Sequence, residues 1–300
     1  MTARDPDVGA ELVARLVAAQ FPQWSDLPVT PVVRGGWNNK TFHLGSEMLV
    51  RLPRARHYVA QVEKEQIWLP RLAPCLPLPI PAPLAMGEPG ESYPWRWSVF
   101  RWIPGEAATH ATIADEREFA AELAGFLSAL HLIETDGGPP PGAHNFFRGG
   151  SLATYDDQTR QALAALREPF DRKVVKAIWD EALATEWTRS PVWVHGDFAA
   201  GNLLISGGRL SAVIDFGTLG IGDPACDLAI AWTTLGDTGR DVFRSALPLD
   251  PATWARGRGW TAWKALILLT RLVDGNPRDV RSAGRVLAEV VADHRRAAAA

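Results

Sequence analysis

The first third of the chain alternates between two spacings of apolar residues. Intervals of three and four, as in Val8, Leu12 and Leu16, predict amphipathic helices. Short apolar runs bounded by turn residues predict strands instead. The two spacings predict, in order, a helix over residues 8–21, strands over 29–34, 41–44 and 48–52, a helix over 57–72 with Val62, Ile67, Leu69 and Leu72 on its apolar side, and a strand over 95–102. A proline-rich run at residues 76–83 predicts an extended connection before the last strand.

Helical spacing dominates the rest of the chain. In residues 115–132, Phe119, Leu123 and Phe126 share one face with the apolar residues that follow them, so we expect a core helix. The remaining pattern predicts helices over 152–167, 171–187, 241–247, 251–273 and 279–296, a strand over 192–194 and a β-hairpin over 203–214. Residues 135–150 contain the run GGPPPG and predict a long irregular loop, and loops of this length are often functional.

Composition limits the classes of function. The 300-residue chain has a formal net charge of −3, which gives no electrostatic case for binding nucleic acid or an anionic membrane. No apolar run follows a basic N-terminus, and the apolar stretch at residues 265–269 is too short to span a bilayer. Cys75 and Cys226 lie far apart without a metal-like spacing, as expected of reduced thiols. We therefore expect a cytoplasmic protein, either a monomer or a homodimer, without nucleic-acid or membrane partners.

The charges are divided unevenly along the chain. Residues 1–104 hold 11 basic and 9 acidic residues, whereas the remainder holds 20 and 25. A basic first part and an acidic second part suit an anionic nucleotide in the former and a cationic substrate in the latter. Scatter of solvated charges explains so small a difference equally well.

Candidate chemistry is concentrated in residues 194–202, VHGDFAAGN, and in residues 214–217, IDFG. Asp197 is followed by Asn202 five positions later and by Asp215 eighteen positions later. This is the spacing of a phosphoryl-transfer loop, in which the first Asp accepts a hydroxyl proton while the Asn and the second Asp hold metal. The residue types suit that task, because a carboxylate can take up the proton and magnesium prefers hard oxygen ligands.

A purely structural β-hairpin is the alternative interpretation of this region. It explains the strands at residues 203–205 and 210–214 and the Gly207-Gly208 turn between them. It does not explain why His195 and the three polar residues of the motif gather at the two ends of the hairpin. We therefore favour the catalytic interpretation.

Two runs carry a family resemblance: HGD at residues 195–197, with Gly where protein kinases have Arg, and GDPACDLA at 222–229. With them the chain resembles the aminoglycoside phosphotransferase and choline kinase-like family of small-molecule kinases, over about residues 32–232. The resemblance implies an α+β, two-lobed, protein-kinase-like fold with a small antiparallel-sheet lobe and a larger, mainly helical lobe. It implies a nucleotide-binding lobe over residues 1–104 and a catalytic and acceptor-binding lobe over 105–300.

The implied activity is ATP- and Mg2+-dependent transfer of the γ-phosphate to a hydroxyl of a small molecule, with GTP open as the donor. Asp197 would be the base, His195 would hold the shape of its loop, and Asn202 and Asp215 would bind magnesium. The other class of function is a catalytically silent nucleotide-binding or scaffold protein of the same fold. Silent relatives usually lose the base or a metal ligand, and this chain keeps all three. ATP turnover with and without acceptors would separate the two classes.

The resemblance also assigns a phosphate-contacting cation. It is Arg51, where protein kinases have lysine, and Arg can contact phosphate in a bidentate way. Glu65 is the best match to the glutamate that pairs with this cation. Glu63 is the competitor, two positions away and so on a different side of the helix.

Two segments are expected to border the nucleotide. The run RGGWNNK, which contains Gly35 and Gly36, predicts either a phosphate-binding loop or an ordinary hairpin turn. By resemblance, backbone groups near Arg101 and Ile103 would meet adenine, with Phe100 at the back of the pocket. An edge strand that leads into a turn is the alternative for this second segment.

The remaining polar residues have structural and substrate-binding interpretations. By resemblance, Asp227 braces the catalytic loop, while Asp223 is expected to cap a helix before Pro224. We expect His131 to be a satisfied core histidine rather than a metal ligand. The acceptor is expected to be polyhydroxylated or amino-bearing, bound between residues 135–150 and the helices over 232–279.

The side chains of those helices leave the charge of the acceptor open. They include the carboxylates of Asp237, Asp241, Asp274 and Asp279, which suit a cationic acceptor. The Trp and Leu content of the same helices would suit a bulkier, less polar acceptor. Solvated helix ends account for the carboxylates equally well.

Overall fold

The computed structural model describes residues 8–299 except 34, 35, 37, 168, 274 and 276. Its contacts divide the chain into two compact units. The first unit comprises Met1–Gly105 and Ser211–Gly217, and the second comprises Glu106–Leu210 and Thr218–Ala300. Sequence patterns did not predict the return of residues 211–217 to the first unit. This return places Asp215 in the same unit as Arg51.

The first unit is built on a five-stranded antiparallel sheet with the strand order β1-β2-β3-β5-β4. Its elements are α1 (Ala10–Gln20), β1 (Val29–Pro31), β2 (Asn39–Leu44), β3 (Met48–Pro53), α2 (Val59–Leu72), β4 (Pro83–Gly87) and β5 (Trp97–Arg101). The helix and strand types follow the apolar spacing. β4 is the exception: it begins at Pro83, the last residue of the proline-rich run, and no strand was predicted over its residues.

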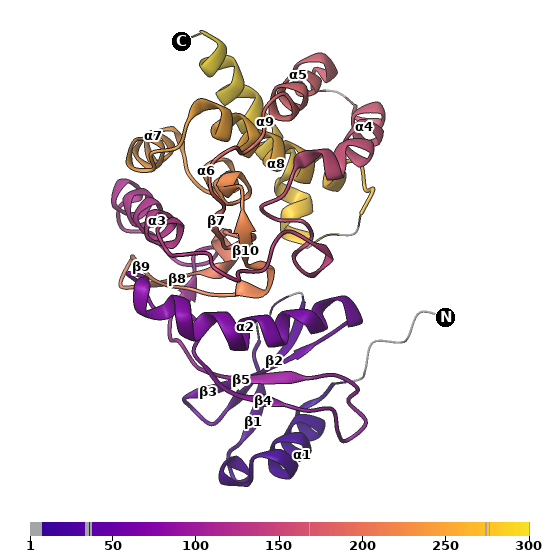
Figure 1. Cartoon of the computed structure of the whole chain (residues 1–300), viewed down its shortest axis with the longest axis vertical. Coiled ribbons are helices and arrows are strands. Elements are labelled where there is room, and N and C mark those ends of the chain that lie inside the picture. Colours follow the sequence, from indigo (N-terminus) through magenta and orange to yellow (C-terminus); the bar gives the residue numbers. More distant parts are fainter. Residues whose placement is uncertain are drawn as a thin grey trace. The chain divides into compact units, whose positions relative to one another are not determined.

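Helix α1 packs on one face of this sheet (Figure 1). Leu16 and Val17 of the helix share a core with Val50 and Trp97 of the strands, and all four side chains are at most 1% exposed. Burying apolar side chains of this size stabilises the fold by about 1.5–3 kcal/mol each. The packing is tight at Gly87, where a Cβ atom would lie 2.0 Å from the Trp97 ring.

Helix α2 lies on the other face of the sheet, and half of its six buried residues are polar (Figure 1). Gln61, Glu65 and Leu69 follow one another at intervals of four and are at most 4% exposed. The predicted apolar side is confirmed at Val62, Leu69 and Leu72, which are buried, and was wrong at Ile67, which is 49% exposed. Apolar spacing misplaced it because the face toward the sheet carries an amide and a carboxylate.

The second unit is mainly helical. Its elements are β6 (Glu106–Ala107), α3 (Glu116–His131), α4 (Asp156–Ala165), α5 (Arg172–Leu183), β7 (Val192–Val194), β8 (Leu203–Ser206), β9 (Arg209–Val213, which continues into the first unit), β10 (Gly220–Gly222), α6 (Ile230–Thr233), α7 (Asp237–Ala246), α8 (Pro251–Leu269) and α9 (Pro277–Ala299). Helix α8 packs against α4, α5 and α9 and is buried on nearly every side. The strands form two small sheets, β6-β8-β9 and β10-β7.

Buried charges on α8 are paired with carboxylates from other elements. Arg256 donates to Asp223 at 2.6 Å, and Arg258 contacts Glu181 and Asp293 at 3.3 and 3.4 Å. Pairing offsets the cost of removing each guanidinium from water. In the described ranges of the chain, no helix combines the length and apolar character that crossing a membrane requires.

His131 is one of the buried groups that depart from this pattern. Nε2 of His131, at the end of α3, is buried and has no hydrogen-bond partner among the described residues, so the expectation of a satisfied histidine was wrong. Burial lowers the pKa of His131 to about 4, because the charged imidazolium loses hydration that no neighbour replaces.

Candidate active site

The catalytic-loop motif begins where β7 ends, in the second unit. β7 pairs with β10, with Val194 opposite Gly220, and the loop then runs through a short 3-10 turn at Ala200–Asn202 into β8. Phe198 is 2% exposed and stacks on Phe126 of α3 at 5.9 Å. The buried phenyl ring anchors the loop, while its neighbour Asp197 is exposed to solvent.

A single buried carboxylate holds the first two residues of the loop. Asp227 accepts hydrogen bonds from the backbone N–H groups of His195, at 2.7 Å, and Gly196, at 2.8 Å. The expected brace is therefore confirmed. Burial raises the pKa of Asp227, and His195 and the two N–H donors partly oppose that rise.

Only glycine fits at position 196. Gly196 has φ +81°, and a Cβ atom there would lie 2.5 Å from the carbonyl oxygen of Thr218. Thr218 in turn donates its hydroxyl to the carbonyl of His195 at 3.1 Å. The close approach explains why an arginine side chain cannot stand at this position.

His195 and Asn202 fix Asp197 from its two sides. The N–H of Asp197 donates to Nδ1 of the fully buried His195 at 3.2 Å. The side-chain amide of Asn202 donates to the Asp197 carbonyl at 2.9 Å and to its Oδ2 at 3.1 Å. His195 therefore acts within the loop, as the sequence predicted, and the Asp197 carboxylate has a defined orientation.

The first unit holds a separate charged cluster around Arg51 of β3. Its Nη1 donates to Glu65 at 3.0 Å and its Nη2 to Asp215 at 2.7 Å. Burial alone would lower the pKa of Arg51, but the two carboxylates outweigh it and raise the pKa. Glu63 instead pairs with Arg96 on the surface, so Glu65 is the partner of Arg51.

The backbone at Asp215 adopts an unusual conformation. Asp215 has φ +63°, a conformation that costs a residue with a side chain on the order of 1–3 kcal/mol. Beside it, Gln61 of α2 is 2% exposed, and neither polar atom of its amide has a hydrogen-bond partner in the part of the chain that the structure describes. A Cβ atom on Gly217 would lie 2.6 Å from Oε1 of Gln61. Sequence reasoning missed Gln61, and its place four residues before Glu65 was the available signal.

The three residues expected to border adenine differ in whether they are available to it. Phe100 is 1% exposed, and the Arg51 guanidinium lies 5.6 Å from its ring. The N–H of Arg101 already donates to Ala82 at 2.9 Å, so it is not available to a base. Within the described part of the chain, the N–H of Ile103 makes no such bond. Ile103 therefore remains the candidate donor.

The glycine-rich turn is only partly described. Gly35 lies outside the described residues. Gly36 is exposed and belongs to no helix or strand. It borders a hollow of the first unit that Asn39, Lys40 and Arg54 also line.

Near the catalytic loop, the second unit brings together residues that sequence reasoning did not single out as a set. Arg148 comes from the 135–150 loop, and its guanidinium lies 4.8 Å from the ring of Trp260 and 5.1 Å from that of Trp263. Lys264 follows on the same helix, and the charges of Asp197 and Asp279 act on it. The clearest signal in the sequence was the spacing of Trp260 and Lys264, one helical turn apart on α8.

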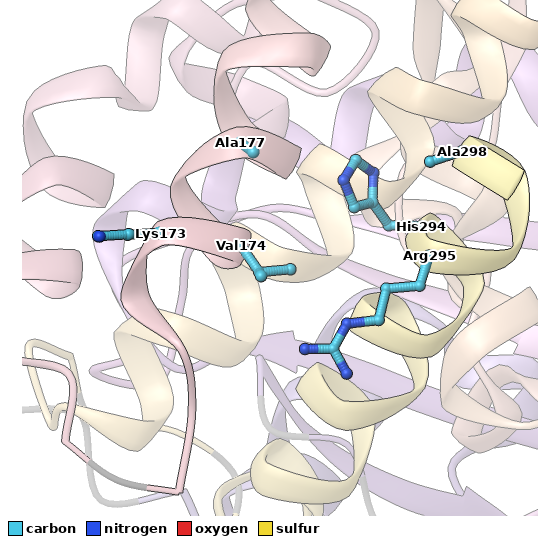
Figure 2. A pocket seen from close by; sticks show the side chains of 6 residues that line it. All are labelled: Lys173, Val174, Ala177, His294, Arg295 and Ala298. Atoms are coloured by element: carbon cyan, nitrogen blue, oxygen red, sulfur yellow. The ribbon is translucent and has the colours of Figure 1, made fainter.

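A shallow hollow elsewhere in the second unit is not part of this site. It lies between α5 and α9 (Figure 2), and its lining residues are Lys173, Val174, Ala177, His294, Arg295 and Ala298. None of the motif residues lines it.

Comparison with known proteins identifies the relatives of this chain. An aminoglycoside 3'-phosphotransferase of Escherichia coli is 31% identical over 150 residues, which are 47% of this chain and 53% of that protein. The chain thus matches about half the length of this curated relative.

Solved structures resemble the whole chain more broadly. The GDP complex of aminoglycoside 2'-phosphotransferase-IIIa has a TM-score of 0.72 at 17% identity and covers 96% of this chain and all of its own. Macrolide 2'-phosphotransferase of Brachybacterium faecium has a TM-score of 0.60 at 22% identity, covering 93% and 98%. These similarities confirm the predicted α+β, protein-kinase-like fold. Residues 29–262, well over half of the chain, match the model of the phosphotransferase enzyme family, and the chain belongs to that family.

Proposed function

We propose that this chain transfers the γ-phosphate of ATP, with Mg2+, to a hydroxyl group of a small molecule. The observation that carries the proposal is the exposed Asp197 carboxylate, fixed by Asn202 in a loop that Asp227 braces. A carboxylate presented in this way can orient a hydroxyl and accept its proton. Family membership and the GDP complex of a structural relative support a nucleotide as the donor.

The proposed reaction forms one bond and breaks another, and residues of this chain act on the proton and on the phosphates. The acceptor oxygen forms a bond to the γ-phosphorus, and its proton passes to Asp197. The bond between the γ-phosphorus and the bridging oxygen breaks, and ADP leaves. Glu65 and Asp215 use only two of the five N–H donors of Arg51, so the other three are available to the phosphates.

The two proposed magnesium ligands each keep an oxygen available. Asn202 uses its amide nitrogen on Asp197, which leaves Oδ1. Asp215 uses Oδ1 on Arg51, which leaves Oδ2. Hard oxygen donors of this kind suit magnesium, which when bound would neutralise charge on the β- and γ-phosphates. The spacing of the motif supports assigning both residues to the metal.

Phosphate transfer from ATP and from GTP to a panel of aminoglycosides, macrolides, amino alcohols and sugars tests the proposal. Transfer should require magnesium. Asp215→Ala should raise the magnesium requirement more than Asn202→Ala, because it removes a charged ligand rather than a neutral one. An unchanged magnesium requirement in Asp215→Ala would remove that residue from the metal site. Nucleotide binding without transfer to any acceptor would favour a silent protein of the same fold.

A further inference from the structure

The 135–150 loop holds the backbone of Arg148 rigidly. Asn145, which is fully buried, accepts from the N–H of Gly142 at 3.0 Å and donates its amide to the Arg148 carbonyl at 3.0 Å. The hydroxyl of Tyr155 donates to the Phe146 carbonyl at 2.7 Å. The loop therefore presents the Arg148 side chain from a fixed point.

The guanidinium of Arg148 is positioned but not neutralised. It lies against the rings of Trp260 and Trp263, and its Nη1 is buried without a hydrogen-bond partner among the residues that the structure describes. Among the described residues, no carboxylate forms an ion pair with it. The buried guanidiniums of Arg256 and Arg258 in the same unit do have carboxylate partners. A buried donor without an acceptor costs free energy unless a ligand supplies one.

Lys264 adds a second cation next to this one. It lies four residues after Trp260 on α8, so both residues share a helix face, and its side chain is exposed. Within the described ranges it makes no hydrogen bond or ion pair. The charges of Arg148, Asp197 and Asp279 all act on Lys264, so each of these groups lies within electrostatic range of it. The two cations therefore repel each other at a site within electrostatic range of the catalytic carboxylate.

We propose that Arg148 and Lys264 form an anion subsite beside Asp197, so that the acceptor carries an acidic group, carboxylate or phosphate, besides its reacting hydroxyl. This inference rests on the proposed phosphotransfer. An acidic group would supply the acceptor that Nη1 lacks and relieve the repulsion between the two cations. A polycationic amino sugar would add positive charge to the same place.

Asp279 and Asp227 limit how cationic the subsite is, without filling it. The charges of Asp279 and Lys264 act on each other, but among the described residues no ion pair joins the two. Asp227 also lies in the field of Arg148, but its two oxygens accept from the catalytic-loop backbone. The subsite can therefore hold one acidic group, with Asp279 left for a neutral or amino substituent.

Matched acceptors that differ in one group test the inference. Glucuronic acid and glucose 6-phosphate represent the two acidic classes, glucose the neutral one and glucosamine the amino one, with other hydroxy acids and their neutral and amino analogues beside them. Phosphate transfer is measured for the wild type, Arg148→Met and Lys264→Met. Lys173→Met, in the hollow between α5 and α9, is the control that also removes one positive charge.

We expect the acidic members to be the better acceptors. Arg148→Met and Lys264→Met should each lower kcat/KM for them by roughly tenfold or more, and by less than about twofold for neutral members, since only the acidic group loses a charge-assisted hydrogen bond. Preference between carboxylate and phosphate members identifies the acidic class. A preference for amino members, or equal losses for acidic and neutral members, would overturn the inference and leave the phosphotransferase intact.

A binding measurement decides the matter even if no member is phosphorylated. Thermal unfolding is followed with each compound in the presence of ADP and magnesium. ADP occupies the nucleotide site, so that a shift in Tm does not come from acidic compounds bound there. Acidic members should raise the Tm of the wild type and of Lys173→Met but not of Arg148→Met or Lys264→Met. Equal shifts in all four proteins, or none in the wild type, would contradict an anion subsite. Failure of the phosphotransferase proposal shows separately, as a lack of transfer to every compound tested.

Discussion

The catalytic loop of the second unit and the Arg51 cluster of the first treat their charged groups in opposite ways: the loop exposes its carboxylate, whereas the cluster buries and pairs its charges. The loop exposes the carboxylate proposed as the base, Asp197. Two of its neutral backbone N–H groups donate hydrogen bonds to one buried carboxylate, Asp227. The cluster buries most of its charge and satisfies Arg51 with two carboxylates from distant parts of the sequence. The loop is thus built for a fixed shape, and the cluster for charge balance.

This difference predicts how each region responds to damage. Removing the Asp197 carboxylate should lower turnover without changing the fold, because this side chain is exposed to solvent and lies at the end of the hydrogen-bond network of the loop. Removing a member of the Arg51 cluster should change both, because it leaves partly buried charges without a partner.

The largest expected effect is that of Asp197→Asn. The amide cannot accept the hydroxyl proton, so turnover should fall by roughly 10²–10⁴-fold, the usual weight of general-base catalysis. Nucleotide affinity and Tm should stay close to those of the wild type. Steady-state kinetics and thermal unfolding measure this, with the exposed Asp157→Asn as the control. Near-normal turnover would remove Asp197 from the role of base.

Asp227→Ala tests the other half of the comparison. It leaves the N–H groups of His195 and Gly196 without their buried acceptor, which should lower the free energy of unfolding by about 2–4 kcal/mol. Turnover should fall as well, because the loop loses its shape. Denaturant unfolding measures the first effect, with Asp157→Ala as the control. An unfolding free energy within experimental error of the wild type would show that the brace is not needed.

The sequence predicted most of the elements and the residues of both regions, because each signal was local. Apolar spacing placed α3 and β7, and the motif placed Asp197 and Asn202 in one loop. The resemblance named Glu65, and the ion pair with Arg51 distinguishes it from Glu63.

The features that the sequence did not predict depend on contacts between distant segments. The pairing of Arg51 with Asp215 joins positions 164 residues apart. The stacking of Arg148 on Trp260 depends on how a long loop folds against α8, and loop conformation has no periodic signal. The buried polar residues of α2 were missed because spacing arguments assume that the buried face is apolar.

The third prediction concerns the cation itself. Arg51→Met leaves Glu65 and Asp215 without their shared partner, so we expect roughly a 10–100-fold loss of kcat/KM for the nucleotide and a lower Tm. Arg51→Lys keeps the charge but not the fork that reaches two carboxylates, and should retain partial activity. Kinetics with ATP as the varied substrate measure both variants. Equal activity of the Lys and Met variants would show that charge at this position is not required.

A smaller effect separates the two glutamates. Glu65→Ala removes one of two carboxylates from Arg51 and should resemble a mild form of Arg51→Met, with a severalfold rise in the KM for ATP. Glu63→Ala removes only an exposed pair with Arg96, a kind of contact worth about 0–1 kcal/mol. The KM values for ATP of the two variants should therefore differ. A greater loss in Glu63→Ala would mean that the pairing around Arg51 is not functional.

The smallest effect at neutral pH is expected for His131→Leu, which supplies a third case for the comparison: a buried group that neither a brace nor a partner compensates. Burial lowers the folded-state pKa of His131 to about 4, below the value of about 6.5 in an unfolded chain. The folded state therefore binds fewer protons than the unfolded state between these two values, and wild-type stability falls as pH drops through that window. Leucine cannot titrate, so the variant should lack this loss.

The variant's unfolding free energy relative to the wild type should rise by about 1–2 kcal/mol when the pH is lowered from 7.5 to 5. Denaturant unfolding at the two pH values measures the difference. If the difference between the two proteins is the same at both pH values, His131 has the same pKa in the folded protein as in the unfolded chain, and burial does not lower it.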